Sequence, residues 1–406
     1  MSVSGTLARP DAEAGVSMNG SLLKAARSLG PLILEHRDAS ERERRLSRPV
    51  IDAMREAGLF RMFTPRALGG LETDPLTLAC VVEEVAGFDS AAAWTFQAGN
   101  TGAWWAGHMP EEGVAELFAD GPDLLMSASF APPHRADAVA GGYRLTGRGP
   151  LASTIRDSPW VLMSGIVHDD GQPRMTPFGP MVVGLVMPTS DVEIVDTWDS
   201  LGMRGTDSND IATDGVFVPS SRSFVLAPQY EPASQFRGPL YRLPATVATI
   251  AIIAPVALAI ARCAIGELRD IATKKVPLGS TKTLRDRTLT QSTLARAEAD
   301  LRAARLLLHD TLSAAWRRAL AGEAFSLEQK ADLMLAGTHA VQQAAEVTDR
   351  MHRLAGTAGI YTRNRLERLL RDAHTVRHHG FHSDSRYETV GQVYLGVEPE
   401  FPFVAF

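Results

Sequence analysis

The hydrophobic pattern of this chain of 406 residues changes twice along its length, and that change limits the folds it can adopt. Up to about residue 120, apolar residues recur at helical spacing, as in the run from Leu22 to Ile33. From about residue 123 to 225, short β-branched and aromatic runs alternate with Gly, Pro, Asp and Asn. Long helical periods return from about residue 240 to 380. We therefore predict an α+β protein, mostly α, with its strands confined to the middle of the chain.

Start and stop signals divide the first block into helices. A helix that opens at Pro49 is expected to stop at Gly58. Asp74 is placed as the N-cap of the next helix, which runs to Val85. A further helix is predicted over residues 90–105.

The middle block predicts a small β-sandwich or barrel, because short strands with regular turn signals are typical of those folds. Six strands are expected, at Leu124–Phe130, Tyr143–Gly147, Trp160–Val167, Met181–Met187, Val192–Trp198 and Ile211–Val218.

The last block opens with nineteen residues that carry no charge, Leu243–Ala261. A membrane helix would look similar, but the chain has no other such span, and we interpret this one as a helix buried on all sides in a helical domain. Helices are also predicted over residues 290–321, 326–354 and 363–379, and long helices with few breaks favour a four-helix bundle.

These blocks define the expected domains. They are a flexible N-terminal tail (1–19), an N-terminal helical domain (20–122), a middle β domain (123–235), a C-terminal four-helix bundle (236–395) and a C-terminal tail (396–406). The last six residues, from Phe401 to Phe406, are strongly apolar, and we expect them to pack against the protein or a neighbouring subunit.

Composition restricts the partners and the cellular location that we expect for this chain. The net charge is −6, which disfavours a nucleic-acid partner. Cys80 and Cys263 are the only cysteines, so a disulfide framework and a cysteine-based zinc site are ruled out and a cytoplasmic location is expected. The segment from Met1 to Val16 is polar and has no apolar core like that of a secretory signal. We predict neither a membrane nor a metal partner.

Several short motifs occur in an order that matches a known family. They are Gly58-Leu59-Phe60 with Thr64–Leu71, Gly142–Gly147, Leu201–Ser208 with Val216–Pro219, Leu354–Gly359, and Leu370–Ala373. Their order and spacing resemble the acyl-CoA dehydrogenase superfamily over about residues 20–397. The resemblance implies a flavin held between the β domain and the C-terminal bundle, and a homotetramer.

The superfamily contains dehydrogenases and oxygenases, and the catalytic base separates them. A dehydrogenase needs a carboxylate to remove the α-proton of a thioester. The two positions where the family places it correspond here to Gly380 and, by hand alignment, to about Val247. A histidine, His379, follows seven residues after Asp372, as in the two-component reduced-flavin-dependent (group D) monooxygenases that the chain resembles. Asp207 instead favours a dehydrogenase, because oxygenase relatives often have Gly at that position.

The resemblance gives two residues catalytic roles. His379 would hydrogen-bond the flavin peroxide or take a proton from the substrate, since histidine titrates near neutrality. Ser153 would lie beside flavin N5 and steady the C4a-hydroperoxyflavin with its hydroxyl. The plainer alternatives are that His379 is a solvated histidine at a helix end and that Ser153 is an ordinary hydroxyl at a strand end.

Other candidates follow from the same alignment. Flavin contacts are predicted for Ser127, Ser129, Ser153, Thr154, Thr206, Ser208 and Arg285. Trp94, Phe96 and Trp104 could line an aromatic substrate pocket, although aromatics at such spacing also suit a hydrophobic core. Arg285 could equally lie in a solvated loop. His374, His378 and His382 are four residues apart, but no carboxylate has matching spacing, so metal binding is not the preferred interpretation.

We therefore predict the oxygenase component of a two-component monooxygenase. It would take reduced FMN or FAD (FMNH2 or FADH2) from a flavin reductase, and use O2 to hydroxylate a small aromatic substrate of phenol or indole type. The alternatives are an N- or S-oxygenase on the same fold, an acyl-CoA dehydrogenase or flavin oxidase with a displaced base, and an inactive flavin-fold interaction module.

Overall fold

The computed structural model describes residues 19–177, 179–227 and 232–405. Of the predicted N-terminal tail, only Asn19 lies inside this part, where it caps the first helix. Phe406, the last residue of the apolar C-terminal segment, lies outside it.

Six helices form the N-terminal part and follow the start signals in the sequence. They are α1 (Gly20–Ser28), α2 (Gly30–Glu43), α3 (Arg48–Glu56), α4 (Pro75–Ala86), α5 (Ser90–Ala106) and α6 (Glu111–Leu117). Asp74 caps α4 as predicted, because its carboxylate accepts from the Thr77 amide at 2.8 Å. The continuous helical pattern near the start is divided between α1 and α2, since Pro31 lies in the first turn of α2 and favours a helix start.

The middle part is a mixed sheet with its own core. Its main strands are β1 (Met126–Val139), β2 (Gly142–Ala152), β3 (Trp160–Asp169), β7 (Val182–Pro188), β8 (Glu193–Val195), β9 (Asn209–Pro219) and β10 (Ser223–Val225), in the order β10-β7-β3-β1-β2-β9-β8. Short strands β4 (Gln172–Pro173), β5 (Met175–Thr176) and β6 (Gly179–Pro180) lie in the connection after β3. β1 pairs with β3 in parallel and with β2 antiparallel. Leu145, Val161 and Ile211 are fully buried in a core that belongs to the sheet alone.

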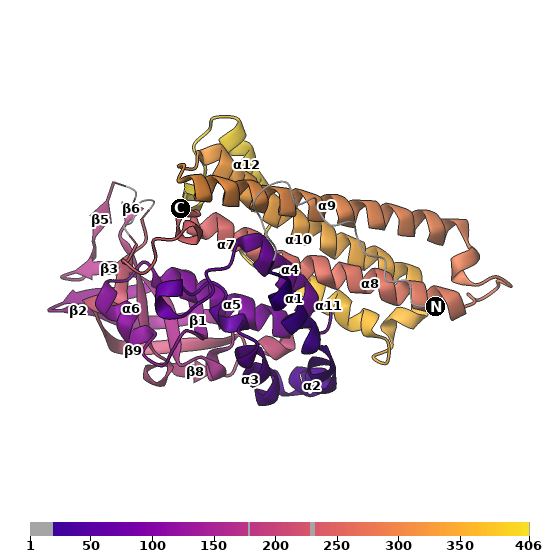
Figure 1. The fold of residues 1–406 in the computed structure, drawn as a ribbon, viewed down its shortest axis with the longest axis horizontal. Coiled ribbons are helices and arrows are strands. Elements are labelled where there is room, and N and C mark those ends of the chain that lie inside the picture. Colours follow the sequence, from indigo (N-terminus) through magenta and orange to yellow (C-terminus); the bar gives the residue numbers. More distant parts are fainter. Residues whose placement is uncertain (1–18, 178, 228–231, 406) are drawn as a thin grey trace.

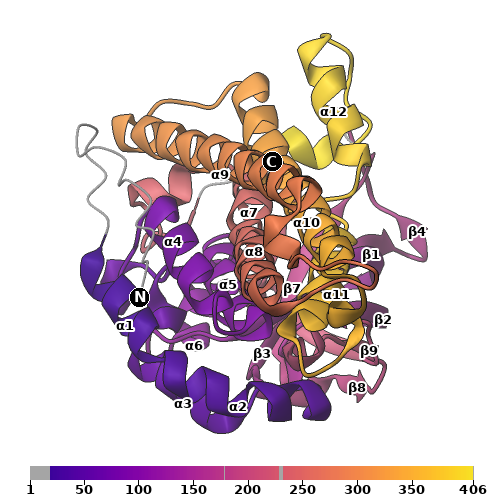
Figure 2. The same cartoon turned by 90° about the vertical axis from the view of Figure 1, so that its right-hand side faces the viewer.

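The C-terminal part is a helical bundle built around α8. Its helices are α7 (Ala245–Ile253), α8 (Pro255–Lys274), α9 (Thr288–Ala321), α10 (Leu327–Ala355), α11 (Arg365–Arg377) and α12 (Ser385–Tyr394). α8 contacts α4, α5, α9, α10 and α11, and the end-on view shows it among them (Figure 2). The stretch Ala245–Lys274 is long and apolar enough to cross a membrane, but 89% of its most apolar window is buried inside the protein. The stretch is buried, as the charge-free run predicts, but it is divided before Pro255 into α7 and α8 and is not one continuous helix.

The sheet lies at one end of the molecule, and the long helices of the bundle extend to the opposite end (Figure 1). α5 contacts both β1 and α8, so it lies between the two. The apolar C-terminal segment packs against its own chain: Val404 is fully buried, Lys330 donates to the Ala405 carbonyl, and the Arg386 guanidinium lies 3.6 Å from the centre of the Phe401 ring.

A buried carboxylate joins these parts. Asp372 on α11 accepts from the Ser90 hydroxyl at the start of α5 (2.5 Å) and from the Met203 amide in the turn before β9 (2.6 Å). Gly202 allows this approach, since a Cβ there would lie 2.3 Å from the Arg371 carbonyl carbon. Burial raises the pKa of Asp372, an effect that the Arg368 charge opposes.

We predict that Asp372→Ala lowers the free energy of unfolding by about 2–4 kcal/mol, because two buried donors lose their acceptor. Chemical denaturation followed by circular dichroism measures the change. Asp310→Ala, at an exposed position on α9, is the control. If Asp372→Ala lowers the free energy of unfolding no more than the control does, the hydrogen bonds of Asp372 with Ser90 and Met203 contribute little to stability.

Candidate functional site

Ser153 lies in a sharply bent loop at the end of β2. Leu151 and Thr154, on either side of it, both have positive φ angles, 60° and 61°. Side chains rarely adopt this conformation without support from the surrounding structure. The bend leaves Ser153 half-buried and Leu151 55% exposed. An apolar side chain and a hydroxyl are therefore presented together at the surface of the sheet.

A row of hydroxyl groups lies behind Ser153. Its Oγ lies 2.8 Å from the Ser208 Oγ, which lies 2.8 Å from the Thr206 Oγ1. Thr206 donates to the Met203 carbonyl at 2.8 Å. From the other side, the Trp94 indole Nε1 donates to the Ser153 Oγ at 3.1 Å. Three predicted flavin contacts and one predicted substrate contact are thus connected by hydrogen bonds.

His379 lies on the other side of Trp94. The centres of their rings are 5.5 Å apart in an edge-on arrangement. The Phe381 amide donates to His379 Nδ1 at 3.3 Å, so the neutral ring carries its proton on Nε2. Burial lowers the pKa of His379 to about 4, below the near-neutral value expected from the sequence. At neutral pH this imidazole is uncharged and its Nε2–H is a hydrogen-bond donor.

His382 supports the turn that carries His379, a role the sequence did not reveal. It is fully buried, and its Nε2 donates to the Ile250 carbonyl in α7 at 2.9 Å. Its amide donates to the His379 carbonyl at 2.8 Å, and Gln342 Nε2 donates to the His382 carbonyl at 2.6 Å. Burial lowers the pKa of His382 to about 3.

The other two histidines weighed as metal ligands face different partners. His374 lies 3.5 Å from Asp349, and His378 Nδ1 contacts the His374 carbonyl at 2.6 Å. Within the described part of the chain, no three His, Cys, Asp or Glu side chains are grouped to hold a metal ion.

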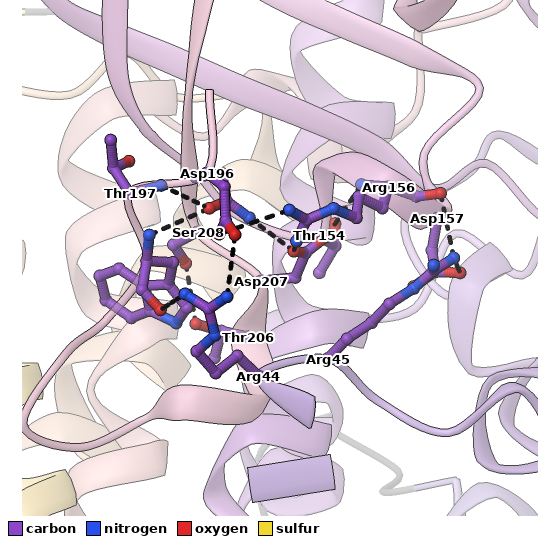
Figure 3. Close-up of polar contacts among 12 residues, drawn as sticks. Arg44, Arg45, Thr154, Arg156, Asp157, Asp196, Thr197, Thr206, Asp207 and Ser208 are labelled. Atoms are coloured by element: carbon purple, nitrogen blue, oxygen red, sulfur yellow. Dashed lines mark hydrogen bonds and ion pairs between the residues drawn. The ribbon is translucent and has the colours of Figure 1, made fainter. Parts of the chain in front are cut away.

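Asp207 is the centre of an ionic network that braces the loop after Ser153 (Figure 3). Its carboxylate accepts from the Arg156 amide at 2.9 Å, pairs with the Arg156 guanidinium, and accepts from Asn209 Nδ2 at 2.7 Å. Arg156 also lies 3.5 Å from Asp196, which pairs with Arg44 at the end of α2 at 2.9 Å.

This network gives a structural role to Asp207, the residue that favoured a dehydrogenase in the sequence. The Asp207 side chain is 2% exposed and both of its oxygens accept hydrogen bonds. Burial raises its pKa, while Arg156 opposes that effect. The carboxylate holds loops together and is not free to take a proton from a ligand.

The remaining candidates have other surroundings. Ser127 donates to the Ser153 carbonyl at 2.7 Å and Ser129 to the Pro150 carbonyl at 2.7 Å, so both support the Ser153 loop from behind. Thr154 is buried, and its hydroxyl lies 3.1 Å from that of Ser158.

Phe96, Trp104 and Arg285 lie outside this cluster. Phe96 and Trp104 are 0% and 1% exposed in the main core, where Trp104 packs edge-on against Phe63 with ring centres 5.7 Å apart. Arg285 is exposed in the connection between α8 and α9, at the end of the bundle away from the sheet (Figure 1). Within one chain, Trp94 is therefore the only one of the three aromatic candidates that contacts Ser153. Arg285 does not reach Ser153.

The fold agrees with comparisons to known proteins. Family models described as acyl-CoA dehydrogenase, N-terminal domain, and acyl-CoA dehydrogenase, C-terminal domain, match residues 25–109 and 251–384. The indole-3-acetate monooxygenase of Pseudomonas putida is 31% identical over 363 residues, which cover 88% of this chain and 90% of that protein. The chain therefore belongs to the acyl-CoA dehydrogenase family.

Two further proteins are similar to this chain. The oxygenase component of an FADH2-dependent resorcinol hydroxylase from Rhizobium sp. is 27% identical over 375 residues, covering 89% of this chain and 90% of that protein. The structure of XiaF from Streptomyces sp. with FADH2 and glycerol has a TM-score of 0.87 at 25% identity and covers 94% of this chain and 96% of that one. The relatives identified by sequence are named as a monooxygenase and an FADH2-dependent hydroxylase, in agreement with the oxygenase that the missing base positions predict.

We predict that acid destabilises the protein through His382. Its pKa is about 3 when folded and about 6.5 when unfolded, so the unfolded chain binds a proton that the folded chain does not. The free energy of unfolding should fall by up to ~1.4 kcal/mol per pH unit from this residue as the pH drops below about 6.5.

Denaturation curves between about pH 7 and pH 5 measure that slope. His382→Gln should flatten this slope while keeping a donor for the Ile250 carbonyl. The matched control is His378→Gln, because His378 is a nearby histidine whose side chain is exposed. An unchanged slope in His382→Gln would contradict the assignment.

Proposed function

We propose that this protein is the oxygenase component of a two-component monooxygenase that uses reduced FMN or FAD and O2 to hydroxylate a small aromatic compound. The observation that carries the proposal is the cluster of Ser153, Trp94 and neutral His379, three half-buried side chains from three parts of the chain. No carboxylate stands at either family position for a dehydrogenase base, which are Gly380 and Val247.

The residues around Ser153 fit a flavin. Its isoalloxazine ring has broad apolar faces and a polar edge, and the loop offers the exposed Leu151 side chain next to a hydroxyl that keeps an unused lone pair. The positive φ angles at Leu151 and Thr154 hold that pair of groups outward. Ser153, Ser208 and Thr206 would hold the polar edge, directly or through their hydrogen bonds.

Reduced flavin supplies the oxygen chemistry, and the protein supplies orientation and hydrogen bonds. His379 presents a neutral Nε2–H donor, since Nδ1 is occupied by the Phe381 amide. Trp94 holds the Ser153 hydroxyl with its N–H and places its ring edge against His379. The buried helices α7 and α8 keep this side of the molecule dry, which limits side reactions with water.

Several features of the proposal rest on the relatives. One relative is named for indole-3-acetate and another for resorcinol, which supports an indole or phenol substrate. A separate flavin reductase would deliver the reduced flavin, as the name "oxygenase component" implies for the resorcinol enzyme. A cytoplasmic homotetramer, in which Arg285 reaches the flavin of another subunit, completes the proposal.

The decisive experiment measures product formed per reduced flavin oxidised. Reduced FMN or FAD is mixed with protein, O2 and an indole or phenol, and hydroxylated product and hydrogen peroxide are quantified. His379→Ala and Ser153→Ala should each lower the yield of product about tenfold to a hundredfold, with peroxide rising in its place.

His374→Ala, on α11 next to Asp349 and five residues before His379, is the matched control and should keep the yield of the wild type. Full product yield in both His379→Ala and Ser153→Ala would contradict the assignment of the site. Bleaching of bound oxidised FAD by an acyl-CoA thioester would instead establish a dehydrogenase.

A further inference from the structure

The row of hydroxyl groups behind Ser153 has a defined direction. At one end Thr206 must donate to the Met203 carbonyl, because a carbonyl has no proton to give. Its single proton is then used, so Ser208 must donate to Thr206 across their 2.8 Å contact. The same reasoning makes Ser153 donate to Ser208, since otherwise two oxygens would face each other at 2.8 Å without a proton.

The other end of the row agrees with this direction. The indole N–H of Trp94 can only donate, so it occupies one lone pair of the Ser153 oxygen. Ser153 therefore has no proton left for a ligand and keeps a single free lone pair. Toward a ligand, this hydroxyl is an acceptor only.

The surroundings prevent the row from reversing. Thr206 and Ser208 are 2% and 5% exposed, so water has little access to replace their partners. The Met203 amide is held by Asp372 at 2.6 Å, and its carbonyl also accepts from the Thr206 amide at 3.0 Å. Met203, which provides the terminal acceptor, is thus held at both its amide and its carbonyl.

We propose that this hydrogen-bond row, through the positioning residues Thr206 and Ser208, makes the site select reduced over oxidised flavin. Reduction places a hydrogen on N5 of the isoalloxazine ring and turns that acceptor into a donor. An acceptor-only Ser153 pairs with the reduced ring and repels the oxidised one. This inference rests on the proposed function, because it requires that Ser153 meets the flavin.

The test is a comparison of flavin binding and needs no turnover. Dissociation constants for oxidised flavin in air and for reduced flavin under anaerobic conditions are measured by titration for the wild type, Thr206→Val, Ser208→Ala and Thr206→Ser. Both FMN and FAD are used. Thermal unfolding confirms that each variant is folded.

In Thr206→Val, Ser208 is released to donate to Ser153, and in Ser208→Ala the Ser153 proton is released directly. Either way Ser153 can donate outward. We expect oxidised flavin to bind about threefold to tenfold more tightly in both variants, while reduced flavin binds no better. Thr206→Ser keeps the hydroxyl and should keep the selectivity of the wild type.

Thr189→Val is the matched control, because it removes another hydroxyl-to-carbonyl hydrogen bond of the β domain, to Ser158 at 2.6 Å. Equal weakening of both redox forms in Thr206→Val and Ser208→Ala, or no change in either, would overturn the inference and leave the proposed function standing. Failure of the wild type to bind either flavin would overturn both.

Discussion

The contact that the rest of the site depends on is the one made by the Asp372 carboxylate. A buried charge is costly unless its hydrogen bonds are made, so Asp372 constrains both of its partners. One partner, Ser90, starts α5, which carries Trp94 four residues later. The other, the Met203 amide, belongs to the residue whose carbonyl ends the hydroxyl row. α11 itself leads to His379. All three parts of the site therefore take their positions from one side chain.

Each block of the sequence contributes one kind of group to the site, and none of them is complete alone. The sheet provides hydroxyls at the end of β2 and before β9, the N-terminal helices provide an indole, and the bundle provides an imidazole. A sheet end suits the hydroxyls because the bent loop there projects Ser153 outward. The apolar helix α7 suits the bundle side, because its Ile250 carbonyl holds His382, and burial there keeps His379 and His382 neutral.

Local signals in the sequence predicted most of the fold, because caps and prolines act over a few residues. Asp74 and Ser326 cap their helices through neighbouring amides, and that chemistry is visible without a structure. Long-range contacts were not predictable in this way. His382 matters because of the Ile250 carbonyl, 132 residues away along the chain. Trp94 and Phe96 look equivalent in sequence, yet positions two apart on a helix face roughly opposite directions, and only Trp94 reaches Ser153.

The electrostatics of the site separate the two chemistries of this family. A dehydrogenase needs a carboxylate that is free to take a proton from a bound thioester. Near Ser153, Asp207 is enclosed by Arg156 and Asn209, and Asp372 is occupied by Ser90 and Met203. His379 is uncharged at neutral pH and offers a donor. What remains for a ligand is a neutral surface with one oriented acceptor and one oriented donor. Such a surface cannot drive proton abstraction, but it can hold a reactive ring in one orientation, which is what oxygen transfer from a reduced flavin requires.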